Sequence, residues 1–260
     1  MKTIQELFDL NGRKAVVTGA SGGIGSACAL GLAQAGADIA LHYCSNRTPL
    51  EKLSNEIQKL GRDVLIVQAY ISNYDDVNRM ANEIDKKWGR VDILFNNAGI
   101  GLTVEPEKSS QDQWLKVIDT NLNGIFYCAQ AFGKIMIREG GGSIINTGSM
   151  SADIINRPEE VSYSTSKAGV HAMTRGLAAC WAKYKIRVNA IAPGYIATEM
   201  SLPEMRNRPE WVKTYWTDWT PQNRVAPPEE LVGLVIYLAS DASSYMTGSA
   251  LTIDGGFTVY

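Results

Sequence analysis

The chain has 260 residues, of which 45% are hydrophobic and 20% are charged, and its formal net charge is −2. A chain of this length can bury a large core, and its near-neutral charge without a Lys/Arg-rich stretch argues against a nucleic-acid partner. No apolar run approaches the ~18 residues of a membrane span. Residues 1–11 lack the charged-then-apolar pattern of a signal peptide, so we expect a cytoplasmic protein with no membrane partner.

Four cysteines are scattered along the chain without a Cys-x-x-Cys or His-paired pattern. They are Cys28, Cys44, Cys128 and Cys180. Three of them fall in apolar or helical surroundings, where a free cysteine packs as a small hydrophobic residue. We therefore expect neither a disulfide nor a metal site.

Short β-rich runs alternate with amphipathic stretches along the chain. Strands are predicted at residues 15–18, 38–43, 63–69, 91–96, 142–147, 187–192 and 250–253. Helices are predicted directly after the first strand and over residues 49–60, 74–88, 111–139, 161–183 and 228–239. This alternation predicts an α/β fold, a single-domain Rossmann-like doubly wound parallel sheet of about seven strands flanked by helices. No linker or repeat divides the chain, so residues 1–260 are expected to form one domain.

The turn after the first strand is rich in glycine. Residues 18–25 read Thr-Gly-Ala-Ser-Gly-Gly-Ile-Gly, between the apolar run 15–17 and a helical stretch that begins near Ala27. In a strand-turn-helix unit, such glycines let backbone N–H groups approach a pyrophosphate at the helix N-terminus. The sequence therefore predicts a nucleotide-phosphate site at this turn.

Tyr163 and Lys167 are four residues apart in a predicted helix, so they share one helix face. A nearby ammonium group favours the phenolate and lowers the pKa of a tyrosine from its reference of about 10. We therefore expect Tyr163 to donate and accept a proton near neutral pH. The simpler interpretation is a solvated surface pair, because tyrosine and lysine occur at this spacing on many helices.

Six motifs in order resemble those of the classical short-chain dehydrogenase/reductase family, over nearly the whole chain. They are the turn 18–25, Asn-Asn-Ala-Gly at 96–99, Asn121 within 120–124, Ser149 within 148–151, the pair Tyr163 and Lys167, and Pro-Gly-Tyr-Ile-Ala-Thr at 193–198. The resemblance implies an oxidoreductase that transfers a hydride between a nicotinamide cofactor and a ketone or secondary alcohol. It also implies a homotetramer whose interface includes the helix of Tyr163, where Cys180 replaces a glutamate that is frequent in relatives.

The resemblance implies four catalytic residues. Tyr163 donates the proton to the substrate oxygen, and Ser149 hydrogen-bonds that oxygen. Lys167 lowers the pKa of Tyr163 and binds the nicotinamide ribose, and Asn121 holds a water that links Lys167 to solvent. The simpler alternatives are that Ser149 caps a turn and that Asn121 caps or kinks its helix.

The residues after the second strand favour NADP(H), with NAD(H) as the alternative. A dinucleotide fold that prefers NAD usually has an acid there, but residues 42–47 read His-Tyr-Cys-Ser-Asn-Arg, with no acid until Glu51. Serine, asparagine and arginine can donate to a 2′-phosphate, which a carboxylate would repel. Arg47 has the alternative of being a solvated loop residue. The expected cofactor-binding residues are Gly19, Ser21, Gly23, Ile24, Gly25, Tyr43, Ser45, Asn46, Arg47, Tyr70, Ile71, Asn97, Ala98, Gly99, Tyr163, Lys167, Pro193, Gly194, Ile196 and Thr198.

Tyr70 departs from the family pattern, because relatives usually carry at this place an aspartate that contacts the adenine. A phenol can lie beside or stack on the adenine ring, but it cannot accept from the amino group as a carboxylate does. We therefore expect this substitution to weaken cofactor binding.

A loop at about residues 199–222 is expected to cover the substrate. It contains Trp211, Tyr215, Trp216 and Trp219, whose rings suit sugar C–H surfaces and hydrophobic ketones equally, or pack between helices or subunits. Residues 149–158 and 219–224 resemble the polyol and ketose branch of the family, which includes mannitol, arabinitol, sorbose and xylulose reductases and carbonyl reductases of bulky ketones. The expected substrate contacts are Ser149, Ser151, Asn156, Tyr163 and Tyr195, with Asp153 as a further polar group.

Two other functions stay open at this point. A 3-oxoacyl-thioester reductase would prefer a basic surface for an acidic carrier, and the net charge of −2 disfavours it. A catalytically silent nucleotide-binding scaffold usually lacks one of the four catalytic residues, whereas this chain has all of them.

Overall fold

Seven parallel strands form one sheet in the order β3-β2-β1-β4-β5-β6-β7 in the computed structural model, which describes residues 2–260. The strands are β1 (Lys14–Val17), β2 (Asp38–Tyr43), β3 (Val64–Gln68), β4 (Ile93–Asn96), β5 (Gly142–Thr147), β6 (Ile186–Pro193) and β7 (Ala250–Ile253). Each predicted strand is present to within two residues at either end, and the predicted doubly wound α/β fold is confirmed.

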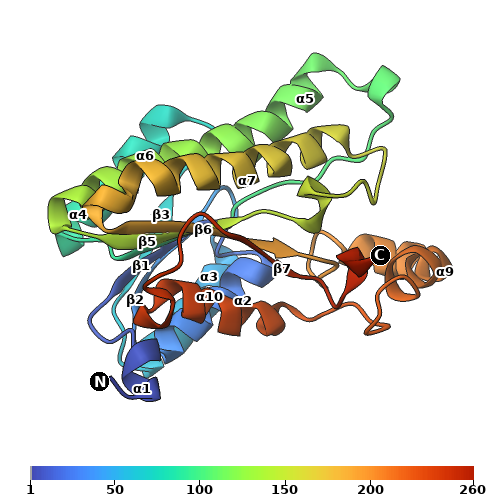
Figure 1. The fold of residues 1–260 in the computed structure, drawn as a ribbon. Coiled ribbons are helices and arrows are strands. Elements are labelled where there is room, and N and C mark those ends of the chain that lie inside the picture. The colour runs from blue at the N-terminus through green and yellow to red at the C-terminus, as the bar shows by residue number, and fades with distance from the viewer. Residues whose placement is uncertain (1) are drawn as a thin grey trace.

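Helices cover both faces of the sheet (Figure 1). One face carries α4 (Tyr74–Trp88), α6 (Gly124–Glu139) and α7 (Val161–Trp181), and the other carries α2 (Gly23–Gln34), α3 (Thr48–Lys59) and α10 (Val232–Ala239). The remaining α-helices are α1 (Ile4–Phe8), α5 (Gln111–Ile118), α8 (Leu202–Asn207) and α9 (Pro209–Val212).

The strands are apolar on both sides because each face is buried under helices. In β1, Ala15 and Val17 belong to the core beneath α2, α3 and α10, whereas Val16 belongs to the core beneath α4 and α6. Ile93 and Leu94 of β4 divide between the two cores in the same way. Successive side chains point to opposite faces of the sheet, and both faces are buried, so the strands read as continuous apolar runs.

Two predicted elements differ from the structure. The helix expected over 111–139 is interrupted by a π-helical turn at Asp119–Asn123, which includes Asn121. The segment 199–222, expected to be a loop, holds α8, α9 and a π-helical turn at Lys213–Thr217. Pro203 and Pro209 stand in the first turns of α8 and α9, where the missing N–H of proline costs the helix no hydrogen bond.

Smaller differences concern helix ends: α7 ends at Trp181 and continues as a 3-10 turn at Ala182–Tyr184, and a 3-10 turn at Pro228–Leu231 precedes α10.

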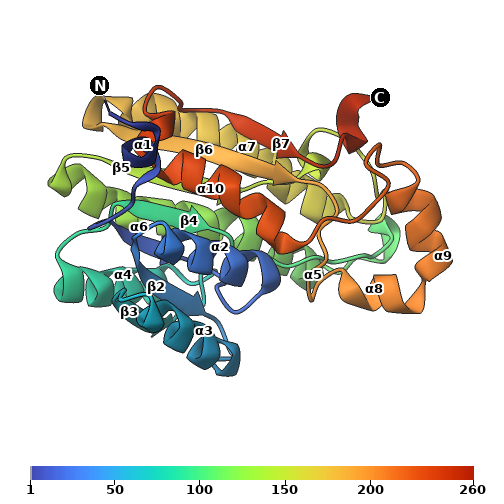
Figure 2. The ribbon, with the colours of Figure 1, turned by 90° about the horizontal axis from the view of Figure 1, so that it is seen from below.

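The order of the strands reverses between β1 and β4, so the loops that follow them leave toward opposite faces and open a crevice. Figure 2 shows α8 and α9 projecting beyond the carboxyl end of the sheet, near the C-terminus. The fold therefore brings the motifs at the strand ends together beneath the segment 199–222. No helix within residues 2–260 combines the length and the apolar character needed to cross a membrane.

Candidate active site

Two adjoining cavities lie at the carboxyl end of the sheet. We call the first, of about 650 Å³, the glycine cavity, because Gly19, Gly22 and Gly23 line it. We call the second, of about 300 Å³, the serine cavity, because Ser149 and Ser151 line it. The residues common to both walls are Ile24, Thr147, Tyr163, Thr198 and Met200. A ligand in one cavity can therefore reach a ligand in the other at Tyr163.

His42 holds the glycine-rich turn in place through hydrogen bonds to the backbone. The Gly19 N–H donates to His42 Nδ1 at 3.0 Å, and His42 Nε2 lies 3.0 Å from the Ala69 carbonyl oxygen. Burial lowers the pKa of His42 to about 4, so the ring is neutral, and one tautomer satisfies both contacts. Sequence reasoning did not identify His42, because its partners are backbone groups that only the folded sheet brings to it.

The turn also packs against the turn that follows β4. Thr18 Oγ1 accepts from the backbone N–H groups of Asn97 and Ala98 at 2.9 and 3.1 Å. Gly19 has a φ of +64°, and a Cβ there would lie 2.8 Å from Ala98 Cα. The close approach leaves no room for a side chain, and the positive φ also favours glycine at this position.

A carboxylate of this chain lies at the same helix N-terminus. Glu199 Oε2 accepts from the Gly23 N–H at 2.9 Å, and Glu199 lines the glycine cavity. A negative group is favoured there because the first N–H groups of a helix have no intrahelical partner. The contact shows that the N-terminus of α2 binds an oxyanion.

The end of β2 supplies no carboxylate to the glycine cavity. Cys44 and Ser45 line its wall, whereas Asn46 and Arg47 are exposed beside it and Asn46 Oδ1 accepts from the Thr48 N–H. Tyr43 and Gly25 lie outside the lining, and a Cβ at Gly25 would lie 2.2 Å from the Gly19 carbonyl oxygen.

The other expected cofactor residues divide between the two cavities. Gly19, Ser21, Gly23, Ile24, Tyr70, Ile71, Asn97, Ala98, Gly99, Tyr163, Lys167 and Thr198 line the glycine cavity, and Pro193, Gly194 and Ile196 line the serine cavity. Tyr70 remains 52% exposed.

Ser149, Tyr163 and Lys167 meet where the cavities join. Lys167 is 3% exposed, and its Nζ donates to the Thr147 carbonyl oxygen at 2.8 Å and lies 5.5 Å from the centroid of the Tyr163 ring. Ser149 Oγ accepts from the Ser151 N–H at 3.1 Å. Ser149 thus caps a turn, as the simpler interpretation held, and its hydroxyl proton is directed to a second contact, the Tyr163 hydroxyl.

The expected lowering of the Tyr163 pKa is not what this structure gives. Burial raises the pKa of Tyr163 to about 12, and a hydrogen bond with Ser149 opposes that rise only in part. Burial also lowers the pKa of Lys167 to about 8. Desolvation sets the direction of both pKa shifts, and the Lys167 ammonium donates to the Thr147 carbonyl oxygen.

Asn121 lies in the π-helical turn and is fully buried. Its Oδ1 accepts from the Ile100 N–H and its Nδ2 donates to the Ile100 carbonyl oxygen, both at 2.8 Å. A Cβ at Gly99 would lie 3.2 Å from Asn121 Oδ1 and 3.7 Å from Lys167 Nζ. Asn121 therefore fixes the chain beside Lys167.

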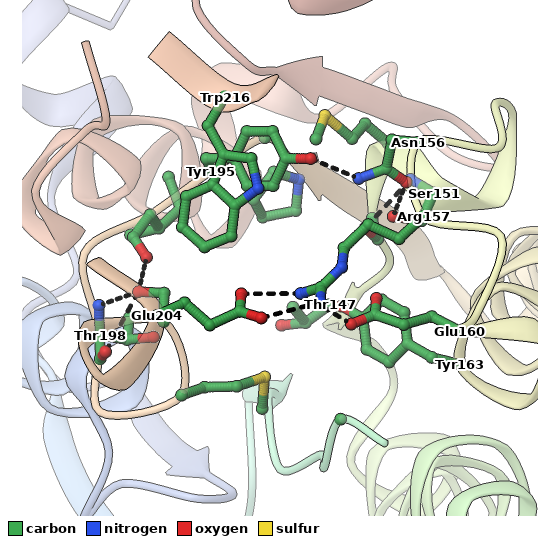
Figure 3. Close-up of a pocket in the computed structure, with 18 of the residues that line it drawn as sticks. Thr147, Ser151, Asn156, Arg157, Glu160, Tyr163, Tyr195, Thr198, Glu204 and Trp216 are labelled. Atoms are coloured by element: carbon green, nitrogen blue, oxygen red, sulfur yellow. Dashed lines mark hydrogen bonds and ion pairs between the residues drawn. The ribbon is translucent and has the colours of Figure 1, made fainter. Parts of the chain in front are cut away.

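Polar side chains form a linked row along the wall of the serine cavity (Figure 3). Ser151 Oγ donates to Asn156 Oδ1 at 2.7 Å, and Asn156 Nδ2 donates to Tyr195 Oη at 3.0 Å. The Tyr195 ring stacks on Trp216 with centroids 4.3 Å apart. The arrangement presents hydroxyl and amide groups beside an aromatic face.

Other expected substrate contacts lie away from the cavity. The Asp153 carboxylate is 62% exposed, and its Oδ2 lies 3.5 Å from His171 Nδ1, outside the lining. Trp219 and Tyr215 are exposed, and Trp211 packs against Trp216 and Arg157 without lining the cavity. Of the four aromatic residues of the segment 199–222, Trp216 alone lines the serine cavity among the described residues.

Sequence reasoning also missed a charged cluster in the serine cavity. Arg157 donates to both carboxylate oxygens of Glu204 at 2.8 Å and lies 3.1 Å from Glu160 (Figure 3). Burial raises the pKa of Glu160, although Arg157 opposes this. Glu204 is 47 residues from Arg157, so no local pattern could have joined them. Within residues 2–260, no group of three His, Cys, Asp or Glu side chains is placed to hold a metal ion.

Comparison with known proteins gives close matches over nearly the whole chain. A family model described as "Enoyl-(Acyl carrier protein) reductase" matches residues 19–258. A sorbose reductase from Candida albicans is 41% identical over 98% of this chain and 90% of its own length. A galactitol 2-dehydrogenase from Rhizobium johnstonii is 41% identical over 98% and 99%, and an NADP-dependent mannitol dehydrogenase from Hypocrea jecorina is 39% identical over 97% and 95%.

Solved structures agree in fold. A short-chain type dehydrogenase/reductase from Mycobacterium marinum has a TM-score of 0.93 and 40% identity, covering 99% of this chain and 100% of that one. A gluconate 5-dehydrogenase from Burkholderia cenocepacia, in complex with NADP and tartrate, has a TM-score of 0.93 and 33% identity, with coverages of 99% and 100%. With this sheet and this degree of identity over almost its whole length, the chain belongs to the short-chain dehydrogenase/reductase family of oxidoreductases.

Proposed function

We propose that this protein transfers a hydride between NADP(H) and a ketose or the corresponding polyol. The observation that carries the proposal is the place of Tyr163, which lines both the glycine cavity and the hydroxyl- and amide-lined serine cavity. The printed names of the relatives, sorbose reductase and galactitol and mannitol dehydrogenases, support the same substrate class.

In the proposed reaction, a nicotinamide bound at the joint of the cavities supplies or accepts the hydride. Tyr163 donates the proton to the carbonyl oxygen during reduction, and the Ser149 hydroxyl donates a hydrogen bond to the same oxygen when the substrate is bound. Lys167, when protonated, stabilises the Tyr163 phenolate. Asn121 fixes the chain beside Lys167 and, in this proposal, holds a water through which the proton is replaced.

The residues present fit a dinucleotide phosphate. We assign the pyrophosphate to the backbone of Gly19, Ser21, Gly23 and Ile24, where an oxyanion already accepts a hydrogen bond, with Gly25 needed for the close packing of the turn. Tyr70, Ile71 and the turn Asn97, Ala98 and Gly99 are assigned to the adenosine, and Pro193, Gly194, Ile196 and Thr198 to the nicotinamide.

NADP(H) is proposed over NAD(H) because no carboxylate at the end of β2 faces the cavity. Ser45 is assigned to the 2′-phosphate, with Asn46 and Arg47 beside it and Tyr43 at the strand end behind them. The name of the NADP-dependent mannitol dehydrogenase and the bound NADP of the gluconate 5-dehydrogenase support this choice. Ser45→Asp places a charge there that repels the phosphate, so its ratio of kcat/KM for NADPH to that for NADH should fall by roughly tenfold or more.

The activity is tested by following the oxidation of NADPH and NADH with a panel of ketoses, one aryl ketone and one 3-oxoacyl thioester. Turnover of a ketose with NADPH, with lower rates for the other two substrates, supports the proposal. Preferred turnover of the thioester would replace it with a 3-oxoacyl-thioester reductase activity. Tight NADPH binding without turnover of any substrate would leave a nucleotide-binding scaffold.

We further propose a cytoplasmic homotetramer. Trp114 and Leu115 of α5 and Phe126 of α6 are large apolar side chains that are 37–40% exposed, and covering them against another copy would remove apolar surface from water. Cys180 of α7 is also exposed. Light scattering of the purified protein measures the assembly, and fractionation of the source cells measures the location.

A further inference from the structure

The serine cavity contains an arginine whose positive charge is paired with carboxylates. Both Nη groups of Arg157 bind Glu204, and Nη1 also lies 3.1 Å from Glu160 Oε1. The Arg157 side chain is 11% exposed, and its guanidinium carbon lies 5.3 Å from the centroid of the Trp211 ring. The arginine therefore joins α8 to the segment before α7 in a geometry that leaves it little freedom.

The charge balance of this cluster is negative when both carboxyl groups are ionised. Of the described residues that line the serine cavity, Arg157, Glu160 and Glu204 are the charged ones. Even with Glu160 protonated, the Glu204 carboxylate neutralises the positive charge of the guanidinium through their bidentate pair. An anion entering the cavity thus meets no free cation, and it meets at least one carboxylate in a partly desolvated setting, where repulsion is stronger than in water.

The remaining donors of the cavity suit neutral oxygens. Arg157 Nε is buried and has no hydrogen-bond partner among the described residues. It therefore presents no charge to the cavity, whereas Ser151, Asn156 and Tyr195 offer neutral hydroxyl and amide groups along the wall. Hydroxyl groups can satisfy these donors without adding charge to the cluster.

We infer that the Arg157–Glu204–Glu160 cluster makes this enzyme select neutral polyhydroxy substrates and reject those that carry a carboxylate or phosphate. The inference rests on the proposed function and names the charge class of its substrate. The fold alone does not decide this property, since a structural neighbour with a TM-score of 0.93 is named for a sugar acid, gluconate. Glu204 and Glu160 are then specificity-determining residues.

The test uses pairs of ketoses and keto acids that differ only by CH₂OH against COO⁻. L-Sorbose is paired with 5-keto-D-gluconate, and D-fructose with D-fructuronate, each reduced by NADPH with the purified protein. We expect kcat/KM for the neutral member to exceed that for the acid by roughly tenfold or more, which corresponds to about 1.4 kcal/mol. Equal or higher values for the acids would overturn the inference.

The variant Glu204→Gln removes one negative charge and keeps an amide oxygen for Arg157. The ratio of kcat/KM for the acid to that for the neutral ketose should rise by about threefold or more in this variant, chiefly through a lower KM for the acid. The control is Glu210→Gln, since Glu210 is exposed on α9 and outside the cavity lining. A correctly folded Glu204→Gln protein with an unchanged ratio would contradict the assignment of Glu204.

A binding measurement separates this inference from the proposed function. Calorimetric titration of the NADP⁺ complex with D-glucitol and D-gluconate compares the two charges without turnover. If the protein reduces no ketose but binds D-gluconate more weakly than D-glucitol, the proposed function is contradicted and the charge selection is supported. If neither sugar binds and neither ketose is reduced, both conclusions fall.

Discussion

The Lys167 ammonium nitrogen lies 5.5 Å from the centroid of the Tyr163 ring, one helical turn along α7. Tyr163 lines both cavities, and we propose its hydroxyl as the proton donor to the substrate. Tyr163→Phe should lower kcat by roughly 10²–10⁴-fold, because it removes that proton and little else. The dissociation constant for NADPH, measured by fluorescence, should change much less.

The matched control for this variant is Tyr215→Phe, which removes a hydroxyl from a tyrosine that is 53% exposed and outside both linings. Its kcat should stay close to that of the unchanged protein. A Tyr163→Phe enzyme that kept full turnover would exclude Tyr163 as the proton donor.

Burial of Lys167 predicts a specific pH dependence of stability. The pKa is lowered from 10.5 to about 8 in the folded chain, so between these values the unfolded chain carries a proton that the folded chain has lost. The contribution of this residue to the free energy of unfolding therefore rises with pH across that window. Below pH ~8 the buried lysine is charged, and its full destabilising effect is present. The whole effect is on the order of 3 kcal/mol at most.

Lys167→Met should abolish this rise, which denaturant unfolding of the cofactor-free protein at several pH values would measure. Other groups titrate in the same range, so the difference between variant and unchanged protein is the quantity to compare. Lys183→Met, at an exposed lysine, is the control. A difference that did not vary with pH would show that Lys167 keeps an ordinary pKa.

Local patterns predicted the fold because strand burial and the glycine turn are properties of neighbouring residues. The period of two in Ala15, Val16 and Val17 and the glycines after them required no distant information. The direction of the shift in the Tyr163 pKa could not be predicted in this way. The spacing to Lys167 does not reveal that both side chains are buried, or that the Lys167 ammonium donates to the Thr147 carbonyl oxygen. The ion pair of Arg157 with Glu204 could not be predicted either, since the chain between them forms the whole of α7 and β6.

The short helices of the segment 199–222 were missed for a different reason. Pro203 and Pro209 break a helix in its interior but begin one readily, and a single sequence does not distinguish the two positions when the helix has only six or four residues.

Glu199 predicts a competition between this chain and its cofactor. Its carboxylate accepts from Gly23 N–H at 2.9 Å, at the N-terminus of α2 to which we assign the pyrophosphate. Glu199→Gln removes a negative charge from that site, so the dissociation constant for NADPH should fall by about two- to fivefold. Calorimetry measures it, with Glu210→Gln as the control, and weaker binding by the Glu199 variant would contradict the competition.

The last prediction concerns the close approach of the glycine turn to Ala98. Gly19→Ala puts a Cβ 2.8 Å from Ala98 Cα at a φ of +64°, so the turn must shift. The left-handed backbone alone costs an alanine about 1–2 kcal/mol, and the shift moves the Gly19 N–H away from His42. We expect a lower free energy of unfolding and a loss of NADPH affinity of roughly tenfold or more, since the backbone donors no longer converge.

Gly233→Ala makes the same chemical change where it meets nothing. Gly233 is exposed on α10, and a Cβ there has no atom within 4 Å. Alanine has the higher helix propensity, so this variant should be more stable by about 0.5–1 kcal/mol with unchanged NADPH affinity. Thermal unfolding measures the stability of both variants, and NADPH titration measures their affinity. If Gly19→Ala bound NADPH as tightly as Gly233→Ala, the geometry of the glycine turn would have changed without consequence for the ligand. The glycine turn would then not be the phosphate site.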